Sequence, residues 1–270
     1  MSQREGSLGQ AFVAAIQFLT RIPVPVEVPF TNAVLKRSTL FFPVAGLLVG
    51  LATWGGGWLL QQVLPVMPAA ALTLLIMLGM TGGLHLDGLM DTADGILSHR
   101  SRERMLEIMK DSRVGAMGVI ACVVILLLQW SVIAACMEQG EWNMLVVLPF
   151  ICSRLVMVWA IASQPYARAE SGLGSLFHGL GIKHVAGAVG MTVVLSMLLL
   201  MSQYGLADNP LSDMLWRSAG LSIGSLLIAF AGAYLFTRMI VRKLGGLTGD
   251  TYGAICELVL TLLLLVRVAL

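Results

Sequence analysis

Three carboxylates in the middle of an otherwise apolar chain are the residues best suited to chemistry. Asp87, Asp91 and Asp94 are spaced i, i+4 and i+7, so on a helix they form one stripe. Like charges in such a stripe repel each other, and a hard metal ion between them relieves the repulsion. Mg²⁺ is the expected ion, because it prefers oxygen ligands and is held by carboxylates together with substrate phosphates. The spacing predicts metal-dependent phosphate transfer, with a plain solvated helix face as the competing interpretation.

Further polar residues flank this stripe. His85 precedes it, and we expect a hydrogen-bonding or substrate-contact role, because zinc would need other Cys or His ligands nearby. The KDSR segment directly precedes the next apolar run, so Lys110, Asp111 and Arg113 are expected near the stripe as substrate-binding residues. Cations beside a carboxylate–metal centre suit a diphosphate substrate. Anchoring of the membrane boundary by positive charge explains the two cations equally well.

A second stretch, GGLTGDTYGAICE at 245–257, echoes GGLHLDGLMDTAD at 82–94. Both begin Gly-Gly-Leu, and both place an acid three positions after the leucine and another acid seven positions later. Asp250 thus mirrors Asp87, and Glu257 mirrors the last acid of the stripe. We interpret the two stretches as paired halves of one site, with chance or shared helix-end chemistry as the alternative.

One basic residue, Arg154, lies inside a long apolar run, and Glu257 lies at the start of another. Charges inside a bilayer are costly, so such residues are functional candidates by default. Arg154 either binds a substrate phosphate or pairs with Glu257, and the sequence leaves both interpretations open.

The elements that position these residues are predicted to be membrane-spanning helices. Of the 270 residues, 57% are hydrophobic and only 12% are charged, about half the charged fraction of a soluble domain. Several apolar runs reach about 20 residues, which is enough to cross a bilayer as a helix. We therefore predict an all-α polytopic membrane protein with about seven transmembrane helices and a single membrane catalytic domain at 41–270. The predicted spans are 41–62, 69–86, 115–137, 144–162, 184–203, 215–237 and 252–270.

Two shorter helices are predicted outside the spans. Residues 1–40 are expected to form a cytoplasmic or interfacial segment, with an amphipathic helix from Leu8 to Leu19. Prolines in the following RIPVPVEVPF break any helix there. The segment SRERMLEIMKDSRVG, between the second and third spans, is predicted to contain a cytoplasmic amphipathic helix with a charged face.

Basic residues gather in three of the six predicted loops. The loops 87–114, 163–183 and 238–251 carry Lys and Arg, whereas the loops between them are neutral or acidic. The positive-inside rule therefore places these loops, the N-terminus and the acidic stripe on the cytoplasmic side, and the C-terminus outside. The net charge of +2 gives no case for a nucleic-acid partner.

These motifs resemble the cobalamin synthase family (adenosylcobinamide-GDP ribazoletransferase, or cobalamin-5′-phosphate synthase). The resemblance is carried by HLDGLMDTADG and RERMLEIMKDSRVGAMG. It is supported, in the same order along the chain, by FLTRIPVP, FFPVAGLLVG, SR and GGLTGDTYGAICE. Together these pieces cover nearly the whole chain.

The resemblance implies a reaction that joins adenosylcobinamide-GDP to α-ribazole or its 5′-phosphate and releases GMP. It implies Mg²⁺ as cofactor and a multi-pass position in the cell inner membrane, with the active site facing the cytoplasm. In this scheme a carboxylate accepts the proton of a ribose hydroxyl, and cations stabilise the leaving GMP. The expected partners are the two substrates and the lipid bilayer, and a homo-oligomer is left open. The expected catalytic residues are Asp87, Asp91, Asp94 and Asp250, the metal ligands Asp87, Asp91 and Asp94, and the substrate-binding residues His85, Lys110, Asp111, Arg113, Arg154 and Glu257.

Other functions are compatible with parts of this pattern. The CDP-alcohol phosphotransferases also cluster aspartates in a membrane and displace a nucleoside monophosphate. Asp87-Gly88 matches the start of their motif, but Asp91-Thr92 stands where Ala-Arg is found, and the later G-x3-D-x3-D is missing. A secondary transporter would use intramembrane acids and repeats, although its site would lie near the midplane. Release of GMP by the purified protein distinguishes the enzyme from a transporter or a membrane scaffold.

Overall fold

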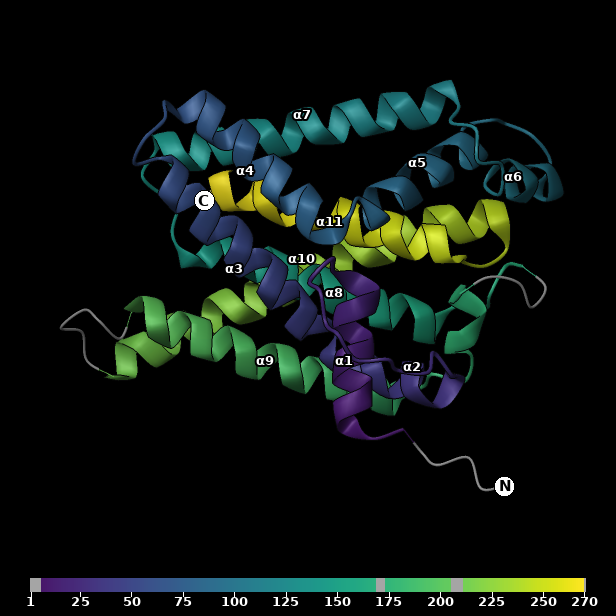
Figure 1. The fold of residues 1–270 in the computed structure, drawn as a ribbon, viewed down its shortest axis with the longest axis horizontal. Coiled ribbons are helices and arrows are strands. Elements are labelled where there is room, and N and C mark those ends of the chain that lie inside the picture. Colours follow the sequence, from purple (N-terminus) through teal and green to yellow (C-terminus); the bar gives the residue numbers. More distant parts are fainter. Residues whose placement is uncertain (1–5, 169–172, 205–210, 270) are drawn as a thin grey trace.

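The computed structural model describes residues 6–168, 173–204 and 211–269, and its regular structure is entirely helical within them. This confirms the predicted all-α architecture (Figure 1). The α-helices are α1 (Leu8–Leu19), α2 (Asn32–Ser38), α3 (Phe42–Leu60), α4 (Val66–Thr81), α5 (Leu84–Ile96), α6 (Arg102–Ile108), α7 (Ala116–Glu138), α8 (Leu148–Ser163), α9 (Ile182–Tyr204), α10 (Leu211–Leu244) and α11 (Gly249–Ala269). Short 3-10 turns are found at Thr39–Phe41, Met144–Val147 and Leu173–Phe177.

The membrane crossings agree with the prediction of about seven. In the described part of the chain, six helical segments are long and apolar enough to span a bilayer, and α4 with α5 supplies a seventh crossing when the bent pair counts as one span. The protein is therefore a multi-pass membrane protein. Most helix ends lie within a few residues of the predicted ones, but α10 is longer than the predicted span 215–237.

The predicted second span, 69–86, is broken near its end. Helix α4 stops at Thr81, and α5 leaves at an angle of 88°. Gly82 and Gly83 form the corner with φ of 63° and 73°, a left-handed conformation that glycine adopts without steric cost. The amide of Gly83 donates to the carbonyl of Leu78 at 3.2 Å, which satisfies one of the open carbonyls at the end of α4. The corner allows α5 to carry its polar residues away from the axis of α4.

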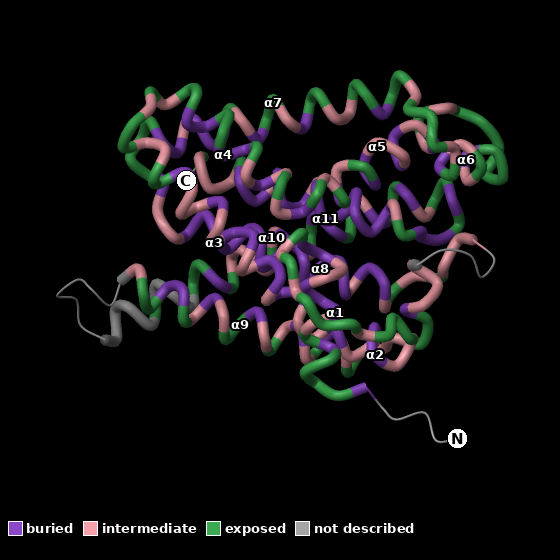
Figure 2. The backbone as a smooth tube through the Cα atoms, in the orientation of Figure 1, coloured by how far each residue is buried: buried purple, intermediate pink, exposed green. Residues whose placement is uncertain are grey.

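Two helices form the centre of the bundle. The apolar windows of α8 and α11 are 89% and 61% buried, whereas that of α7 is only 33% buried. Figure 2 shows the same difference, with α8 largely buried and much of α7 exposed. Large apolar side chains such as Ile120, Val124 and Leu127 are exposed on α7. In a membrane protein such a face is in contact with lipid.

The N-terminal helix packs into the same core as the spans. Helix α1 begins at a capping box formed by Ser7 and Gln10, and its bounds are the predicted ones. Ala15, Ile16 and Leu19 are buried in one cluster with residues of α8 and α11. At the end of the bundle where α6 lies, α5 ends and α7 and α11 begin (right in Figure 1). We call this the α6 end of the bundle.

Candidate active site

Helices α5 and α11 cross in close contact, and two glycines permit it. A Cβ on Gly88 would lie 2.5 Å from the carbonyl oxygen of Asp250, and one on Gly253 would lie 3.2 Å from Cα of His85. The pairing of position 88 with 250 and of 85 with 253 shows that the two helices run antiparallel. The two halves proposed from the sequence echo therefore do lie together, and the N-terminal turn of α11 faces the acidic stripe of α5.

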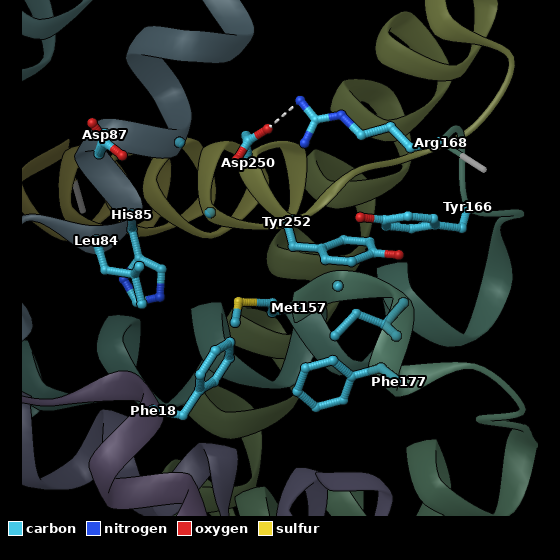
Figure 3. A pocket seen from close by; sticks show the side chains of 15 residues that line it. Phe18, Leu84, His85, Asp87, Met157, Tyr166, Arg168, Phe177, Asp250 and Tyr252 are labelled. Carbon is cyan, nitrogen blue, oxygen red and sulfur yellow. Dashed lines mark hydrogen bonds and ion pairs between the residues drawn. The ribbon is translucent and has the colours of Figure 1, made fainter. Parts of the chain in front are cut away.

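A cavity of about 240 Å³ opens beside this crossing. Figure 3 shows Asp87 and Asp250 on one side of it and Phe18 and Phe177 on the opposite side, with His85 between them. The cavity is thus lined by carboxylates suited to catalysis and by apolar aromatic side chains. The remaining lining residues are Leu84, Gly88, Met157, Ile161, Tyr166, Arg168, Gly174, Gly249, Tyr252 and Gly253.

Asp250 is held by a cation that the sequence reasoning did not select. The guanidinium of Arg168 donates to Asp250 Oδ2 at 2.8 Å, and both side chains are mostly buried. The segment before Arg168 is tied to the start of α11, because Ala167 N–H donates to the carbonyl of Leu247 at 2.7 Å and Leu247 N–H donates to that of Pro165 at 2.9 Å. The sequence offered two weak signals for Arg168, its place in a predicted basic loop and the glycines that follow it on the same face as the acidic stripe, but neither singled it out among the other cations.

The three carboxylates of the predicted metal site have different surroundings. Asp87 is exposed, whereas both oxygens of Asp94 accept backbone hydrogen bonds at 2.7 Å, from Gly115 and Gly118 at the start of α7. Asp94 thus caps the N-terminus of α7, where negative charge is favourable. Asp91 lies close enough to Asp87 and Asp250 to be repelled by their charge. Among the described residues, no three His, Cys, Asp or Glu side chains already converge as a metal site.

Arg154 and His85 form a buried pair behind the cavity. Arg154 is 1% exposed, and its guanidinium donates to Ser153 Oγ at 2.9 Å and lies 3.4 Å from Nδ1 of His85. Glu257 is also buried, but its carboxylate accepts from Gln129 at 2.6 Å. Arg154 and Glu257 are not joined in an ion pair in the described part of the chain. Of the two interpretations of Arg154, the pairing with Glu257 is therefore absent from the structure.

The predicted KDSR residues lie outside the cavity lining. Lys110 is exposed, and Arg113 pairs with Asp111 at 2.8 Å on the same surface loop. Hydrogen bonds from Arg113 lower the pKa of Asp111 to about 2. The structure brings together Asp87, Asp250 and His85 from the predicted set, with Asp91 beside them, but it leaves the KDSR side chains on the surface at the α6 end. Their role in substrate binding stays a prediction.

Comparison with known proteins gives one consistent family. Residues 11–268 match the family model described as cobalamin-5-phosphate synthase. Relatives named adenosylcobinamide-GDP ribazoletransferase include one from Brevibacillus brevis, 36% identical over 96% of this chain and 97% of the relative. The one from Desulfitobacterium hafniense is 41% identical over 90% and 91%, and the one from Herpetosiphon aurantiacus is 40% identical over 95% of each chain. No solved structure matches the chain. The family match spans almost every described residue, including both halves of the cavity, and the chain belongs to the cobalamin-5-phosphate synthase family.

Proposed function

We propose that this chain is an adenosylcobinamide-GDP ribazoletransferase that joins adenosylcobinamide-GDP to α-ribazole or its 5′-phosphate. The observation that carries the proposal is the cavity in which Asp87 and Asp250, from two different helices, face an apolar wall. Such a cavity suits a reaction between a phosphate group and an aromatic nucleoside. The relatives that share the name match 96% and 95% of this chain, which includes almost all of its helices.

The transfer exchanges one phosphorus–oxygen bond for another. A ribose hydroxyl oxygen of the acceptor bonds to the phosphorus that stays with cobinamide. The bond from this phosphorus to the bridging oxygen breaks, and GMP leaves with that oxygen and its electron pair. The hydroxyl proton passes to a carboxylate, for which Asp87 is suited because it is exposed in the cavity. Arg168, already beside the cavity, supplies positive charge for the phosphate oxygens.

Magnesium is part of this proposal. When bound, the ion would neutralise the charge that develops on the diphosphate during transfer. Asp87 and Asp91 fit the ion best, because Mg²⁺ takes oxygen ligands and commonly uses only one or two carboxylates together with substrate phosphates. Asp94, the third predicted ligand, is engaged with two backbone amides of α7. The mutual repulsion of the acids around Asp91 gives a physical reason for a cation there.

We also propose that the α6 end of the bundle faces the cytoplasm and that the protein lies in the cell inner membrane. Basic residues support this orientation: Lys110 and Arg113 lie between α6 and α7, and Arg168 pairs with Asp250 at the start of α11, while the connection from α7 to α8 carries Glu138 and Glu141. The cavity would then receive both substrates from the cytoplasmic side.

Purified protein in detergent, supplied with adenosylcobinamide-GDP, α-ribazole and Mg²⁺, tests the proposal. We expect release of GMP in equal amount to the corrinoid product, and loss of both when a chelator removes the metal. Addition of excess Mg²⁺ should restore the rate. Absence of GMP release from folded protein would rule out the proposed activity, whereas release that persists in chelator would rule out only the magnesium requirement.

A further inference from the structure

One wall of the cavity is apolar and aromatic. It is formed by Phe18 from α1, Met157 from α8, Phe177, and Tyr252 from α11 (Figure 3). The rings of Phe18 and Phe177 lie 5.6 Å apart at their centroids, and Met157 and Phe177 are almost fully buried. Aromatic rings and a methionine thioether together favour a flat apolar group as ligand. Arg168, the cation proposed to bind phosphate, lies with its partner Asp250 on the other side of the cavity.

His85 adds a buried nitrogen next to this wall, which otherwise carries only the hydroxyl of Tyr252 as a polar side-chain group. Arg154 reaches Nδ1 of the imidazole at 3.4 Å. A guanidinium only donates hydrogen bonds, so Nδ1 must be the acceptor and the ring proton is on Nε2. Nε2 is buried and has no hydrogen-bond partner among the described residues. A buried N–H without an acceptor is costly, so a ligand that brings an acceptor to this position gains binding energy.

Arg154 stands one layer behind the cavity. It is not among the lining residues, it contacts Ser153 at 2.9 Å, and its guanidinium carbon lies 5.9 Å from the centre of the Phe150 ring. These contacts hold the guanidinium of Arg154 against His85, so that it does not contact a ligand in the cavity. Arg154 is therefore a positioning residue, which determines which nitrogen of His85 carries the proton.

From this arrangement we infer that the apolar half of the cavity binds the aromatic base of the acceptor nucleoside and that His85 Nε2–H donates to a ring nitrogen of that base. The inference rests on the proposed function, and it assigns a subsite and one hydrogen bond to the acceptor of that reaction. The base of α-ribazole is a flat bicyclic ring with one free lone-pair nitrogen, which can accept this hydrogen bond. With the base in this wall, the ribose extends toward Asp87 and Asp250, where its hydroxyl reacts.

The size of the cavity agrees with this assignment. Drug-sized ligands occupy pockets of about 300–1,000 Å³, so a cavity of about 240 Å³ holds one bicyclic ring system but not a corrin macrocycle. The corrinoid must remain outside, with only its diphosphate group reaching the carboxylates. The alternative acceptor for His85 is a phosphate oxygen, but the apolar residues beside His85 favour the base.

The direct test compares two acceptors with the wild-type protein in detergent. One is α-ribazole, and the other is the matching indole riboside, in which a C–H replaces the free ring nitrogen. With adenosylcobinamide-GDP as donor, we expect kcat/KM for GMP release to be about 10- to 100-fold lower with the indole, because the His85 donor is left unpaired. Equal values would overturn the inference. If no GMP is released with α-ribazole either, the proposed function itself fails, so the two failures are distinguishable.

Variants then assign the discrimination to the pair of residues. His85→Leu removes the donor, and we expect it to lower kcat/KM for α-ribazole until the two acceptors are used equally well. His85→Gln, which keeps an N–H donor, should retain part of the preference. Arg154→Met should lower the preference and Arg154→Lys should restore part of it, because lysine also donates. A merely structural role would reduce both acceptors alike. Full discrimination in folded His85→Leu protein would overturn the assignment to His85 and point to the phosphate instead.

Discussion

Two glycine corners of this molecule have similar sequences, but the helices that follow them run in opposite directions. Gly82-Gly83 precedes α5, and Gly245-Gly246 precedes α11. Gly82, Gly83 and Gly245 all have positive φ, so in each corner glycine allows a sharp turn before a helix. Each helix then presents an acid near its start and another acid two turns later. The shared sequence therefore reflects a shared way of starting a helix.

The difference lies in the direction of the two helices. Helix α5 runs toward the α6 end of the bundle and α11 runs away from it. Because they are antiparallel, the first acids, Asp87 and Asp250, meet in one cavity, whereas the second acids separate. Asp94 caps α7, and Glu257 is buried against Gln129. The echo thus creates one site from two halves, with different tasks for the residues that match in sequence.

A second difference concerns charge. Asp250 has Arg168 as its ion-pair partner, whereas Asp87 is exposed and forms no ion pair within the described residues. An ion pair fixes the position of a carboxylate, whereas an unpaired carboxylate is available to bind a metal or accept a proton. We therefore assign reactivity to the α5 side and positioning to the α11 side, and four sets of variants test this assignment.

The largest effect is expected for Asp87→Asn. The change keeps the shape of the side chain but removes its charge, so kcat should fall about 10³-fold if the carboxylate accepts the proton or binds the metal. Since Asp87 is exposed, the thermal stability in detergent should stay the same. Glu103→Gln, on exposed α6, is the matched control and should keep wild-type GMP release. Wild-type turnover in Asp87→Asn protein would remove this residue from the reaction.

The next largest loss of activity is expected for variants of the Arg168–Asp250 pair. Asp250→Asn leaves the mostly buried guanidinium without its carboxylate, and we expect kcat/KM to fall about 100-fold. Arg168→Gln should have a loss of similar size. If the two residues act as a unit, the change in activation free energy of the double variant is far smaller than the sum of the changes of the two single variants. Strict additivity in this cycle would show that the pair is not a functional unit.

The contact between the two halves depends on Gly88. A methyl group there meets the backbone of Asp250, so Gly88→Ala should lower the free energy of unfolding by about 1–3 kcal/mol and also reduce turnover. Gly79→Ala is the matched control, because a Cβ at that helical position meets nothing within 4 Å. Thermal unfolding in detergent measures both. Equal stability of the two variants would mean that the helices separate without cost.

The smallest effect on turnover is expected for Asp94→Asn. The amide keeps one acceptor but loses the charge at the N-terminus of α7, which should cost about 1 kcal/mol of stability. Turnover should fall less than tenfold, because the side chain serves the helix end. A loss as large as that of Asp87→Asn would instead support the original prediction that Asp94 is a metal ligand.

Much of the fold could be predicted because its causes are local. A run of about 20 apolar residues becomes a spanning helix whatever lies next to it. Ser7 and Gln10 cap α1 within three residues of each other, and the left-handed glycines at 82 and 83 end α4. The helical stripe of Asp87, Asp91 and Asp94 follows from the same short-range geometry.

The parts that could not be predicted depend on contacts between distant segments. Arg168 meets Asp250 across 82 positions of the sequence, and Arg154 meets His85 across 69. By charge alone, Lys110 and Arg113 are as good candidates for phosphate binding as Arg168. Their proximity to the stripe in the sequence does not show which way the loop turns. Asp94 had the correct spacing for a metal ligand, but the amides of Gly115 and Gly118 occupy it.

The participation of helix α1 has a consequence for how the protein is made. Phe18 lines the cavity, and the amide of Arg21 donates to the carbonyl of Met80 at 2.7 Å, next to the glycine corner. The remaining walls come from α5, α8, α11 and the segment between α8 and α9 that carries Tyr166, Arg168 and Phe177. Helix α1 packs mainly against α2 and α3, so it can dock as soon as these neighbours have formed, before the other walls are present. The cavity is therefore assembled from segments far apart in the sequence, and it is incomplete until α11 has been inserted beside α5.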